Sequence, residues 1–327
     1  MKFFRTSKYG AIAGVTIATM FAGTSNTFAQ WQPTETITLV SQSSAGTGND
    51  LLLRKLAEIW TKNNMVPVSV ENENVTGGSG ENARRYVSSE NSGNAHMLYA
   101  YTPGTLNQTI LSNSEYTWDK FTPIAMLVNV PVAVVVNADS PFQSVDDLVE
   151  ASKKDKASVI MGGGSYGGTP SVVGAMIAES AGIEHFPYTP FKGGGEALTE
   201  LLGNHIHFTV ASPPSIKGFV ENGQMRVLAA TEKLDVYPDV PTLAEEGYDV
   251  NVAQFRIIVA PPDIPAEAAA YYTDLLKKTL ETPEWQEYSE ASGFNKSWKD
   301  GPDALAYLDS LADTYRIIDK KMGLLKN

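Results

Sequence analysis

Two segments of the sequence combine glycine with hydroxyl side chains between an apolar strand and a helix. They are Ser43–Asp50 and Gly162–Pro170. Glycine lets the backbone approach a ligand closely, hydroxyls add hydrogen-bond donors, and the first N–H groups of a helix point outward from its N-terminus. Asn49 and Thr169 are placed to cap the two helices that follow. Each segment is therefore predicted to bind a small anion, although in both the glycines could instead serve only to make tight turns.

The second segment also fits two catalytic or cofactor patterns. The run Gly162–Gly167 reads as G-x-G-x-x-G, with Glu184 about 20 positions later, which is formally a dinucleotide-binding pattern. A run this rich in glycine meets that pattern easily, so we expect no cofactor. The same run contains G-x-S-x-G, which makes an exported serine hydrolase using Ser165 an alternative function. A hydrolase of that type needs an acid before its histidine, and no Asp lies between Ser165 and His207.

The composition narrows the chemistry further. The chain has 327 residues and no cysteine, which excludes disulfides, thiolate metal sites and cysteine nucleophiles. Of the four histidines, His205 and His207 share one face of a predicted strand without a third ligand at metal-binding spacing, so no metal site is expected. The formal charge is −12 and the cations are scattered, so nucleic acid is not an expected partner.

The first 29 residues have the pattern of a signal peptide. Lys2, Arg5 and Lys8 precede an apolar stretch over 11–22, and Thr27–Ala29 offers small residues at a cleavage site. The apolar stretch is shorter than the ~20 residues needed to span a bilayer. We therefore predict cleavage after Ala29 and a protein that diffuses freely in a bacterial periplasm.

Strand-like and helix-like segments alternate along the rest of the chain, which is typical of an α/β fold with mostly parallel sheets. Strands are expected at 36–40, 66–70, 96–101, 157–161, 186–188, 206–210, 225–230 and 253–260, and helices at 49–62, 145–154, 169–180, 196–202 and 214–221. Everything from Pro265 onward is expected to be helical, including 303–322.

Two α/β cycles of similar size predict two domains. The apolar crossings near residues 131 and 253 would connect them, with the C-terminal helices returning to the first domain. The boundaries expected are 1–29 for the signal peptide, 30–130 plus 252–327 for the first domain and 131–251 for the second. Ligands of open α/β sheets bind at the carboxyl ends of strands, so both glycine segments would face a cleft between the domains.

Several stretches together resemble a known family. They are Ser43–Asp50, Asn74–Gly80, Phe191–Leu198, Tyr237–Leu243, Gln254–Arg256 and Ala260–Pro262. In this order they resemble the substrate-binding proteins of tripartite tricarboxylate transporters, the Bug or TctC family, over essentially the whole mature chain. The resemblance implies a periplasmic binding protein with two α/β domains whose two glycine loops close on a ligand carboxylate. It also implies delivery of that ligand to a membrane permease of two subunits.

We therefore expect a monomeric, non-catalytic binding protein for a small organic carboxylate, such as a di- or tricarboxylate or an aromatic acid. A sensory protein that presents its ligand without transport is a further alternative. Arg256 is the candidate for a second acidic group, because its planar guanidinium can hold a carboxylate through two hydrogen bonds. The expected ligand-binding residues are Ser43, Ser44, Gly46, Thr47, Asn49, Asp50, Tyr101, Thr102, Gly164, Ser165, Gly167, Gly168, Thr169, Phe191, Ser212 and Arg256.

Overall fold

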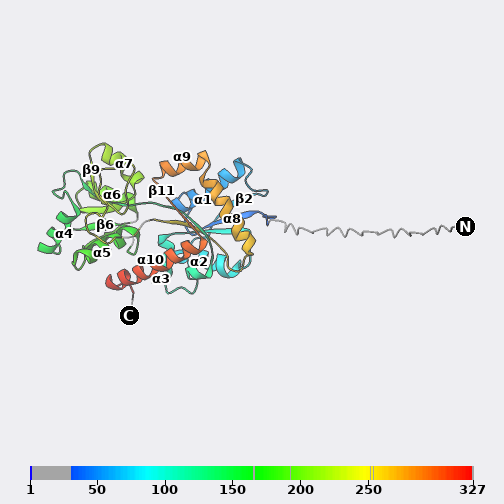
Figure 1. Ribbon diagram of the computed structural model, residues 1–327. Helices are drawn as coiled ribbons and strands as arrows, with labels where there is room; N and C mark the ends of the chain where they lie inside the picture. Colours follow the sequence, from blue (N-terminus) through cyan, green and yellow to red (C-terminus); the bar gives the residue numbers. More distant parts are fainter. Residues whose placement is uncertain (2–30, 165, 192, 251, 253, 326–327) are drawn as a thin grey trace. The chain divides into compact units, whose positions relative to one another are not determined.

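The computed structural model describes residue 1 and residues 31–325 except 165, 192, 251 and 253. Trp31–Asn327 forms one compact unit, and its described strands build two sheets (Figure 1). The expected signal peptide and its cleavage after Ala29 lie outside the described residues, as does Ser165.

Sheet 1 has six strands in the order β11-β4-β10-β3-β1-β2. Their bounds are β1 Ile37–Ser41, β2 Val70–Asn74, β3 Met97–Tyr101, β4 Thr122–Asn129, β10 Arg256–Ala260 and β11 Asn295–Asp300. Sheet 2 has five strands in the order β7-β6-β8-β5-β9. Their bounds are β5 Ala133–Asn137, β6 Met161–Gly163, β7 Tyr188–Pro190, β8 Phe208–Ala211 and β9 Met225–Ala230.

Helices alternate with these strands through much of the chain. They are α1 Gly48–Lys62, α2 Glu81–Arg85, α3 Pro103–Leu111, α4 Val145–Lys154, α5 Thr169–Ala181, α6 Gly194–Leu202, α7 Pro213–Glu221, α8 Ala266–Leu280, α9 Pro283–Ala291 and α10 Gly301–Lys321. Short 3₁₀ turns lie at Gly78–Gly80 and Trp118–Lys120, and Tyr86–Glu90 is π-helical. The α/β class expected from the alternation is confirmed.

The sheets are mixed rather than mostly parallel, so that part of the expectation was wrong. In sheet 1, β1 pairs in parallel with β2 and β3, whereas β10 is antiparallel to β3 and β4, and β11 is antiparallel to β4. In sheet 2, β5 is antiparallel to β8 and β9. Apart from the β11–β4 pair, the antiparallel pairs arise where β5 and β10 enter a sheet from the other sheet, without the helical crossover that would make them parallel to their neighbours.

Several expected segments were misplaced. The expectation of helix throughout from Pro265 was wrong, because β11 forms the edge of sheet 1. The strand expected at 66–70 starts four residues later, as β2, and the one expected at 157–161 begins only at Met161. Helix bounds were predicted more accurately. The bounds of α4 are those expected, and α1, α5 and α7 each differ from their expected bounds by one residue at one end.

The chain passes between the sheets twice, and the two passages pair with each other. The first joins β4 to β5 through 130–132, and the second joins β9 to β10 through 231–255. The N–H of Val130 donates to the carbonyl of Gln254 at 3.1 Å, and the N–H of Gln254 donates to the carbonyl of Val130 at 3.0 Å. Two connecting segments bonded side by side form a short, narrow link between the two sheets.

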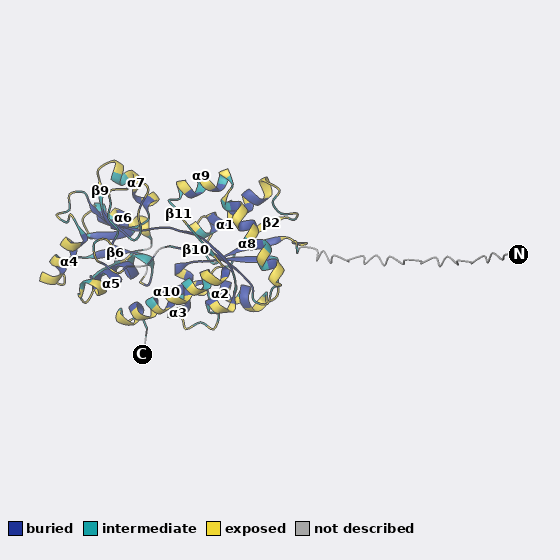
Figure 2. Ribbon diagram, viewed as in Figure 1, coloured by how far each residue is buried: buried dark blue, intermediate teal, exposed yellow. Residues whose placement is uncertain are grey.

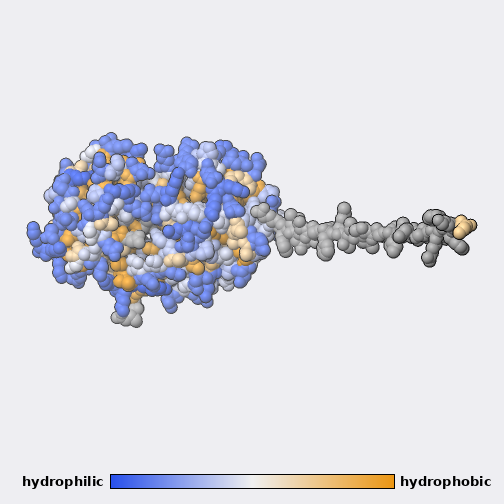
Figure 3. Space-filling view, viewed as in Figure 1, coloured by the Kyte–Doolittle hydropathy of each residue, from blue (hydrophilic) through white to orange (hydrophobic). Residues whose placement is uncertain are grey.

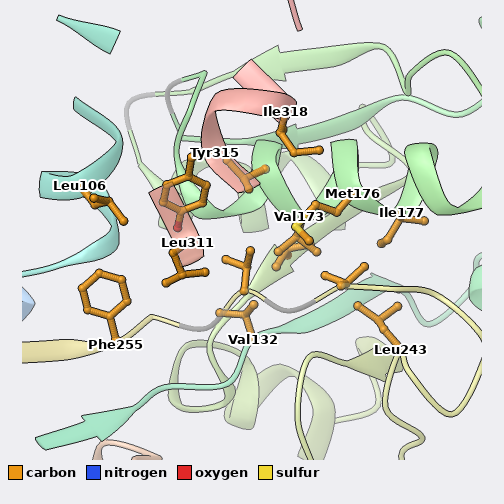
Figure 4. Packing of buried hydrophobic residues seen from close by; sticks show 14 of the residues in the cluster. Leu106, Val132, Val173, Met176, Ile177, Leu243, Phe255, Leu311, Tyr315 and Ile318 are labelled. Carbon is orange, nitrogen blue, oxygen red and sulfur yellow. The ribbon is translucent and has the colours of Figure 1, made fainter. Parts of the chain in front are cut away.

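One hydrophobic cluster extends from sheet 1 to sheet 2. It includes Leu106 of α3, Tyr315 and Ile318 of α10, and Val173 and Met176 of α5 (Figure 4). Separate clusters lie on the other faces of the sheets, one with α1 and α8 and one with α6 and α7. The central strands are accordingly buried, the edge strands β2, β7 and β11 are partly exposed, and the helices keep an exposed outer side (Figure 2).

In the face shown by Figure 3, hydrophilic residues dominate and apolar residues appear in scattered spots. Over the described part of the chain, no helix has the length and hydropathy of a membrane span.

Candidate functional site

Parts of both glycine segments meet in one pocket. The pocket has a volume of about 250 Å³. Its lining residues are Asn49, Thr102, Pro103, Gly104, Thr169, Pro170, Gln254 and Arg256. Asn49 comes from the first segment and Thr169 from the second, so the pocket joins residues that lie beside different sheets. No Asp or Glu is among these lining residues.

Three helices begin at this pocket. Gly48 starts α1, Pro103 starts α3 and Thr169 starts α5. The first N–H groups of each helix lack partners within the helix, and the helix dipole adds partial positive charge at the same end. Three such ends directed at one small space favour a negatively charged occupant.

The caps of these helices differ from the sequence expectation. Thr47 and Gly168 occupy the N-cap positions of α1 and α5, so Asn49 and Thr169 lie inside the first turns instead of capping them. Neither cap residue makes a side-chain hydrogen bond to its helix. The first turns of α1 and α5 thus keep N–H groups for a ligand. Thr102, by contrast, caps α3 and accepts a hydrogen bond from the N–H of Thr105.

Arg256 brings a partly buried positive charge to the same pocket. Its Nη1 donates to the carbonyl of Phe255 at 3.0 Å and to that of Gln254 at 3.4 Å, whereas its buried Nε has no partner among the described residues. No ion pair joins it to a carboxylate of the described residues. Burial lowers its pKa to about 10, which still leaves the guanidinium charged at neutral pH.

The position of Arg256 next to the start of α1 concentrates positive charge in the pocket. A Cβ atom built on Gly48 would lie 3.8 Å from its Nη2, so the guanidinium is next to the positive end of a helix. Two positive groups that face the same space repel each other unless an anion lies between them. The pocket is therefore electrostatically incomplete without a negative ligand.

Hydrogen bonds to Asp50 hold the first glycine segment in its conformation. It is buried, and its carboxylate accepts hydrogen bonds from the N–H of Gly46 at 2.8 Å, Nε of Arg54 at 2.8 Å and Nδ2 of Asn74 at 2.9 Å. These bonds, with that of Arg54 the largest influence, lower the pKa of Asp50 to about 2. The carboxylate is therefore ionised and fully engaged in shaping the turn before α1.

The second segment is supported by two side chains. The hydroxyl of Tyr188 donates to the carbonyl of Gly164 at 2.8 Å, and Nδ2 of Asn107 donates to the carbonyl of Gly167 at 2.5 Å. Gly167 has φ +75°, a conformation that glycine adopts without strain. These contacts fix the backbone that leads into the first turn of α5.

Substituting Gly163 with alanine is expected to weaken ligand binding by about tenfold, or roughly 1.4 kcal/mol. A Cβ at this position would lie 2.7 Å from Cβ of Pro170 and would also meet the Tyr188 hydroxyl, so the segment must shift. Gly218→Ala, where an added Cβ meets nothing within 4 Å, is the control. Titration calorimetry of both variants gives the comparison. Unchanged affinity in Gly163→Ala would show that this packing does not position the site.

The pocket contains four of the residues expected from the sequence, namely Asn49, Thr102, Thr169 and Arg256. Others lie in the segments leading to it without lining it: Ser43, Ser44, Gly46, Thr47, Asp50, Gly164, Gly167 and Gly168. Ser43 still contacts the lining, because Nδ2 of Asn49 donates to its Oγ at 3.4 Å.

Three expected residues have other surroundings. Tyr101 is fully buried, and its hydroxyl lies 3.3 Å from that of Thr109. Ser212 is at the start of α7, with its Oγ 2.9 Å from that of Ser215. Phe191 packs against the cluster of sheet 2 beside α6.

The sequence interpretation missed some lining residues, although signals for them exist. Gln254 directly precedes Phe255 and Arg256 in the second passage between the sheets, and Gly104 lies in the first turn after strand β3. Both positions follow from the rule that ligands bind at strand ends and at the crossings between domains.

The histidines lie elsewhere. His205 is exposed beside Glu200, and Nδ1 of His207 accepts from the N–H of Ile160 at 2.9 Å. Over the described residues, no group of three or more His, Asp or Glu side chains could hold a metal ion.

Comparison with solved structures supports the fold. A TctC solute-binding protein from Polaromonas is 23% identical, with a TM-score of 0.77 over 90% of this chain and 99% of that one. An R. palustris protein solved with adipate is 22% identical, with a TM-score of 0.70 over 89% and 98%. MatC from Rhodopseudomonas palustris, solved with malate, is 18% identical, with a TM-score of 0.63 over 90% and 100%.

Sequence comparison points the same way. A UPF0065 protein from Cupriavidus necator is 27% identical over 97% of both chains. The protein BugT from Bordetella pertussis is 25% identical over 77% of this chain and 78% of its own. The family described as the tripartite tricarboxylate transporter family receptor, TctC, matches residues 52–324. Given this match over most of its length, the chain belongs to the TctC family of solute-binding receptors.

Proposed function

We propose that this receptor captures a small organic carboxylate in the pocket between α1, α3, α5 and β10. The single observation that carries the proposal is the buried, unpaired Nε of Arg256 in a pocket where three helices begin. A buried charge without a partner is costly, and a carboxylate would supply the missing counter-charge and hydrogen-bond acceptors.

The site suits a ligand with two carboxylates. One carboxylate would accept hydrogen bonds from the first turns of α1 and α5, and a second would receive the guanidinium of Arg256. The volume of about 250 Å³ lies below the range of drug-sized pockets, which favours a short aliphatic acid. Family relatives solved with adipate and malate, both dicarboxylates, agree with this class.

The two sheets would act as two lobes that close on the ligand. We place the first lobe at 30–130 plus 252–327 and the second at 131–251. The paired passages at Val130 and Gln254 would be the hinge, because few bonds join the sheets there. Residues from both lobes line the pocket, so closure would complete it and opening would release the ligand.

The remaining features of the proposal are inferred from the sequence and from the resemblance to the family. The receptor would be exported by the signal peptide 1–29, cleaved after Ala29, and would act as a monomer in the periplasm. It would deliver its ligand to a membrane permease of two subunits without catalysing a reaction. No contact in the described residues favours the hydrolase or sensory alternatives.

Titration calorimetry of the purified protein with adipate, malate and the uncharged diamide of adipate tests this proposal. We expect at least one acid to bind and the diamide to fail, because an amide offers the guanidinium no counter-charge. Binding of the diamide with an affinity equal to that of the acid would contradict an anion site.

A further inference from the structure

The carboxylate of Glu232 is held by two amide side chains of sheet 1. Glu232 follows β9 of sheet 2 and lies at the start of the second passage between the sheets. Nδ2 of Asn129 donates to its Oε1 at 3.1 Å, and Nδ2 of Asn295 donates to its Oε2 at 3.0 Å. Each carboxylate oxygen therefore has a donor of its own. We call these three side chains the amide clamp.

The two amides come from neighbouring strands. Asn129 ends β4 and Asn295 begins β11, and the two residues are directly opposite each other in the antiparallel ladder. A further bond, from Nδ2 of Asn295 to the carbonyl of Lys233 at 3.4 Å, reaches the backbone of the second passage. This end of sheet 1 therefore contacts both a side chain and the backbone of the segment that leaves sheet 2.

The amide clamp lies next to the proposed hinge. Asn129 directly precedes the first passage, 130–132. Thr231, which directly precedes Glu232, donates its N–H to the carbonyl of Val132 at 2.9 Å, and its Oγ1 accepts from the N–H of Val132 at 3.1 Å. Glu232 belongs to the proposed second lobe, and both amides belong to the first. Rotation of the lobes about the passages would move the carboxylate relative to its donors, and hydrogen bonds weaken steeply as their geometry is lost.

The strength of the amide clamp suits a reversible motion. No ion pair joins Glu232 to a Lys or Arg of the described residues, so its partners are neutral amides. Glu232 and Asn295 are partly exposed, and water can replace their bond when the lobes separate. Asn129 is buried, with Oδ1 unpaired and Nδ2 bonded only to Glu232 among the described residues. Removal of the carboxylate would leave this amide without a partner in the protein, and that cost favours the closed arrangement.

A second contact between the lobes lies two residues before Asn295. Gly293 has φ +62°, and a Cβ built on it would lie 3.0 Å from Cδ of Pro214 and 3.9 Å from Cβ of Pro213, at the start of α7. The segment 293–295 of the first lobe thus touches the second lobe at α7 and at Glu232. The amide clamp is therefore part of a larger contact between the lobes.

We propose that Glu232 is a positioning residue that holds the two lobes in the closed arrangement through the amides of Asn129 and Asn295. The inference rests on the proposed function, which includes closure of the lobes on a ligand. In this arrangement, Thr102 of the first lobe and Thr169 of the second line one pocket. Glu232 is not among the lining residues, so it acts on the pocket through the position of the lobes.

The absence of cysteine allows lobe closure to be measured without ligand. Spin labels on Lys217→Cys of α7 and Lys278→Cys of α8, both exposed, report the distance between the lobes by pulsed electron resonance. With Glu232 in place, we expect a short distance that matches this structure, together with a longer one. Glu232→Ala should lower the ratio of short-distance to long-distance molecules about tenfold, because two hydrogen bonds to a charged group are lost.

An exchange of partners separates positioning from a general loss of structure. In Glu232→Gln, one acceptor oxygen becomes an N–H donor that faces a donor of the amide clamp. In Asn295→Asp, two carboxylates face each other and repel. Either change alone should reduce the short-distance population. The double variant Glu232→Gln/Asn295→Asp places a donor opposite an acceptor again, so most of that population should return. Its recovery would also show that neither change prevents folding.

Glu287→Gln is the control, because it makes the same charge change at an exposed position of α9. This variant should keep the wild-type distances. A short-distance population in Glu232→Ala equal to that of the wild type, its absence from the ligand-free wild type, or no recovery in the double variant would overturn the proposal. Because no ligand is used, a failure to bind any carboxylate would contradict the proposed function and leave this result standing.

Discussion

Replacing Arg256 with alanine is expected to weaken the binding of a dicarboxylate by about 2–4 kcal/mol, or roughly 30- to 1000-fold. Arg256 is partly buried, its buried Nε has no partner among the described residues, and the lining of the pocket holds no acid that could compete for it. Removal of its charge would leave the second carboxylate of the ligand buried without a counter-charge. A monocarboxylate, held only by the helix N-termini, should lose far less.

Titration calorimetry with adipate and a monocarboxylate of the same chain length gives this comparison. Arg316→Ala is the control, because Arg316 is exposed, pairs with the neighbouring Asp313 on α10 and lies over the ring of Trp118, and it is not among the residues that line the pocket. That variant should bind both acids like the wild type. Equal losses for the two acids in Arg256→Ala would mean that Arg256 supports the fold or the shared carboxylate position, and would remove the argument for a dicarboxylate.

Replacing Asp50 with alanine is expected to lower the free energy of unfolding by about 2–4 kcal/mol. The buried carboxylate accepts three hydrogen bonds, and its removal leaves the N–H of Gly46 without its acceptor and Nδ2 of Asn74 with only one of its two acceptors, the carbonyl of Ser43. The turn before α1 would lose its support, so ligand affinity should fall as well. Urea unfolding measures the first effect and titration calorimetry the second.

Acid should reproduce part of this loss in the wild type. The pKa of Asp50 is lowered from 3.8 to about 2, so its contribution is present above about pH 4 and is lost as the pH falls towards 2. A shift of this size corresponds to about 2 kcal/mol of stability. Asp50→Asn should flatten the decline between about pH 4 and 2.5, whereas Asp235→Asn at an exposed position should not. Identical acid curves for wild type and Asp50→Asn would contradict the assigned role.

The fold class could be predicted because its signals are local. The helices α4, α5 and α7 have apolar periodicity and clear starting residues, so their bounds were predicted closely. The strand β11 could not be predicted, because Asn295–Asp300 is polar and pairs only along one edge with β4. The strand β2 begins later than predicted, because the alternating valines before it have the sequence pattern of a strand but are not part of the paired residues.

The candidate site was predictable only in part, for a different physical reason. Asn49, Thr169 and Arg256 follow from strand ends and crossings, which the sequence pattern reveals. Which residues of a glycine loop face the pocket depends on backbone angles and on support from distant residues. Asn107 and Tyr188, for example, hold the second loop from about 60 and 24 positions away along the chain. No local sequence pattern predicts such long-range contacts.

The net charge of the whole chain does not attract an anionic ligand. The formal charge is −12, so attraction must come from the groups at the pocket itself. Helix N-termini and a guanidinium act over short distances and are screened little by salt when they are partly buried. Ligand affinity should therefore depend on the local geometry of the closed pocket.

Native mass spectrometry of gently purified protein tests whether the pocket holds an organic carboxylate against Arg256. The ligand carried by the wild type is released, identified by fragmentation and compared with that carried by Arg256→Ala. We expect a small di- or tricarboxylic acid on the wild type and little or none on the variant. A ligand without a carboxyl group, or the same acid at equal occupancy on both proteins, would contradict it.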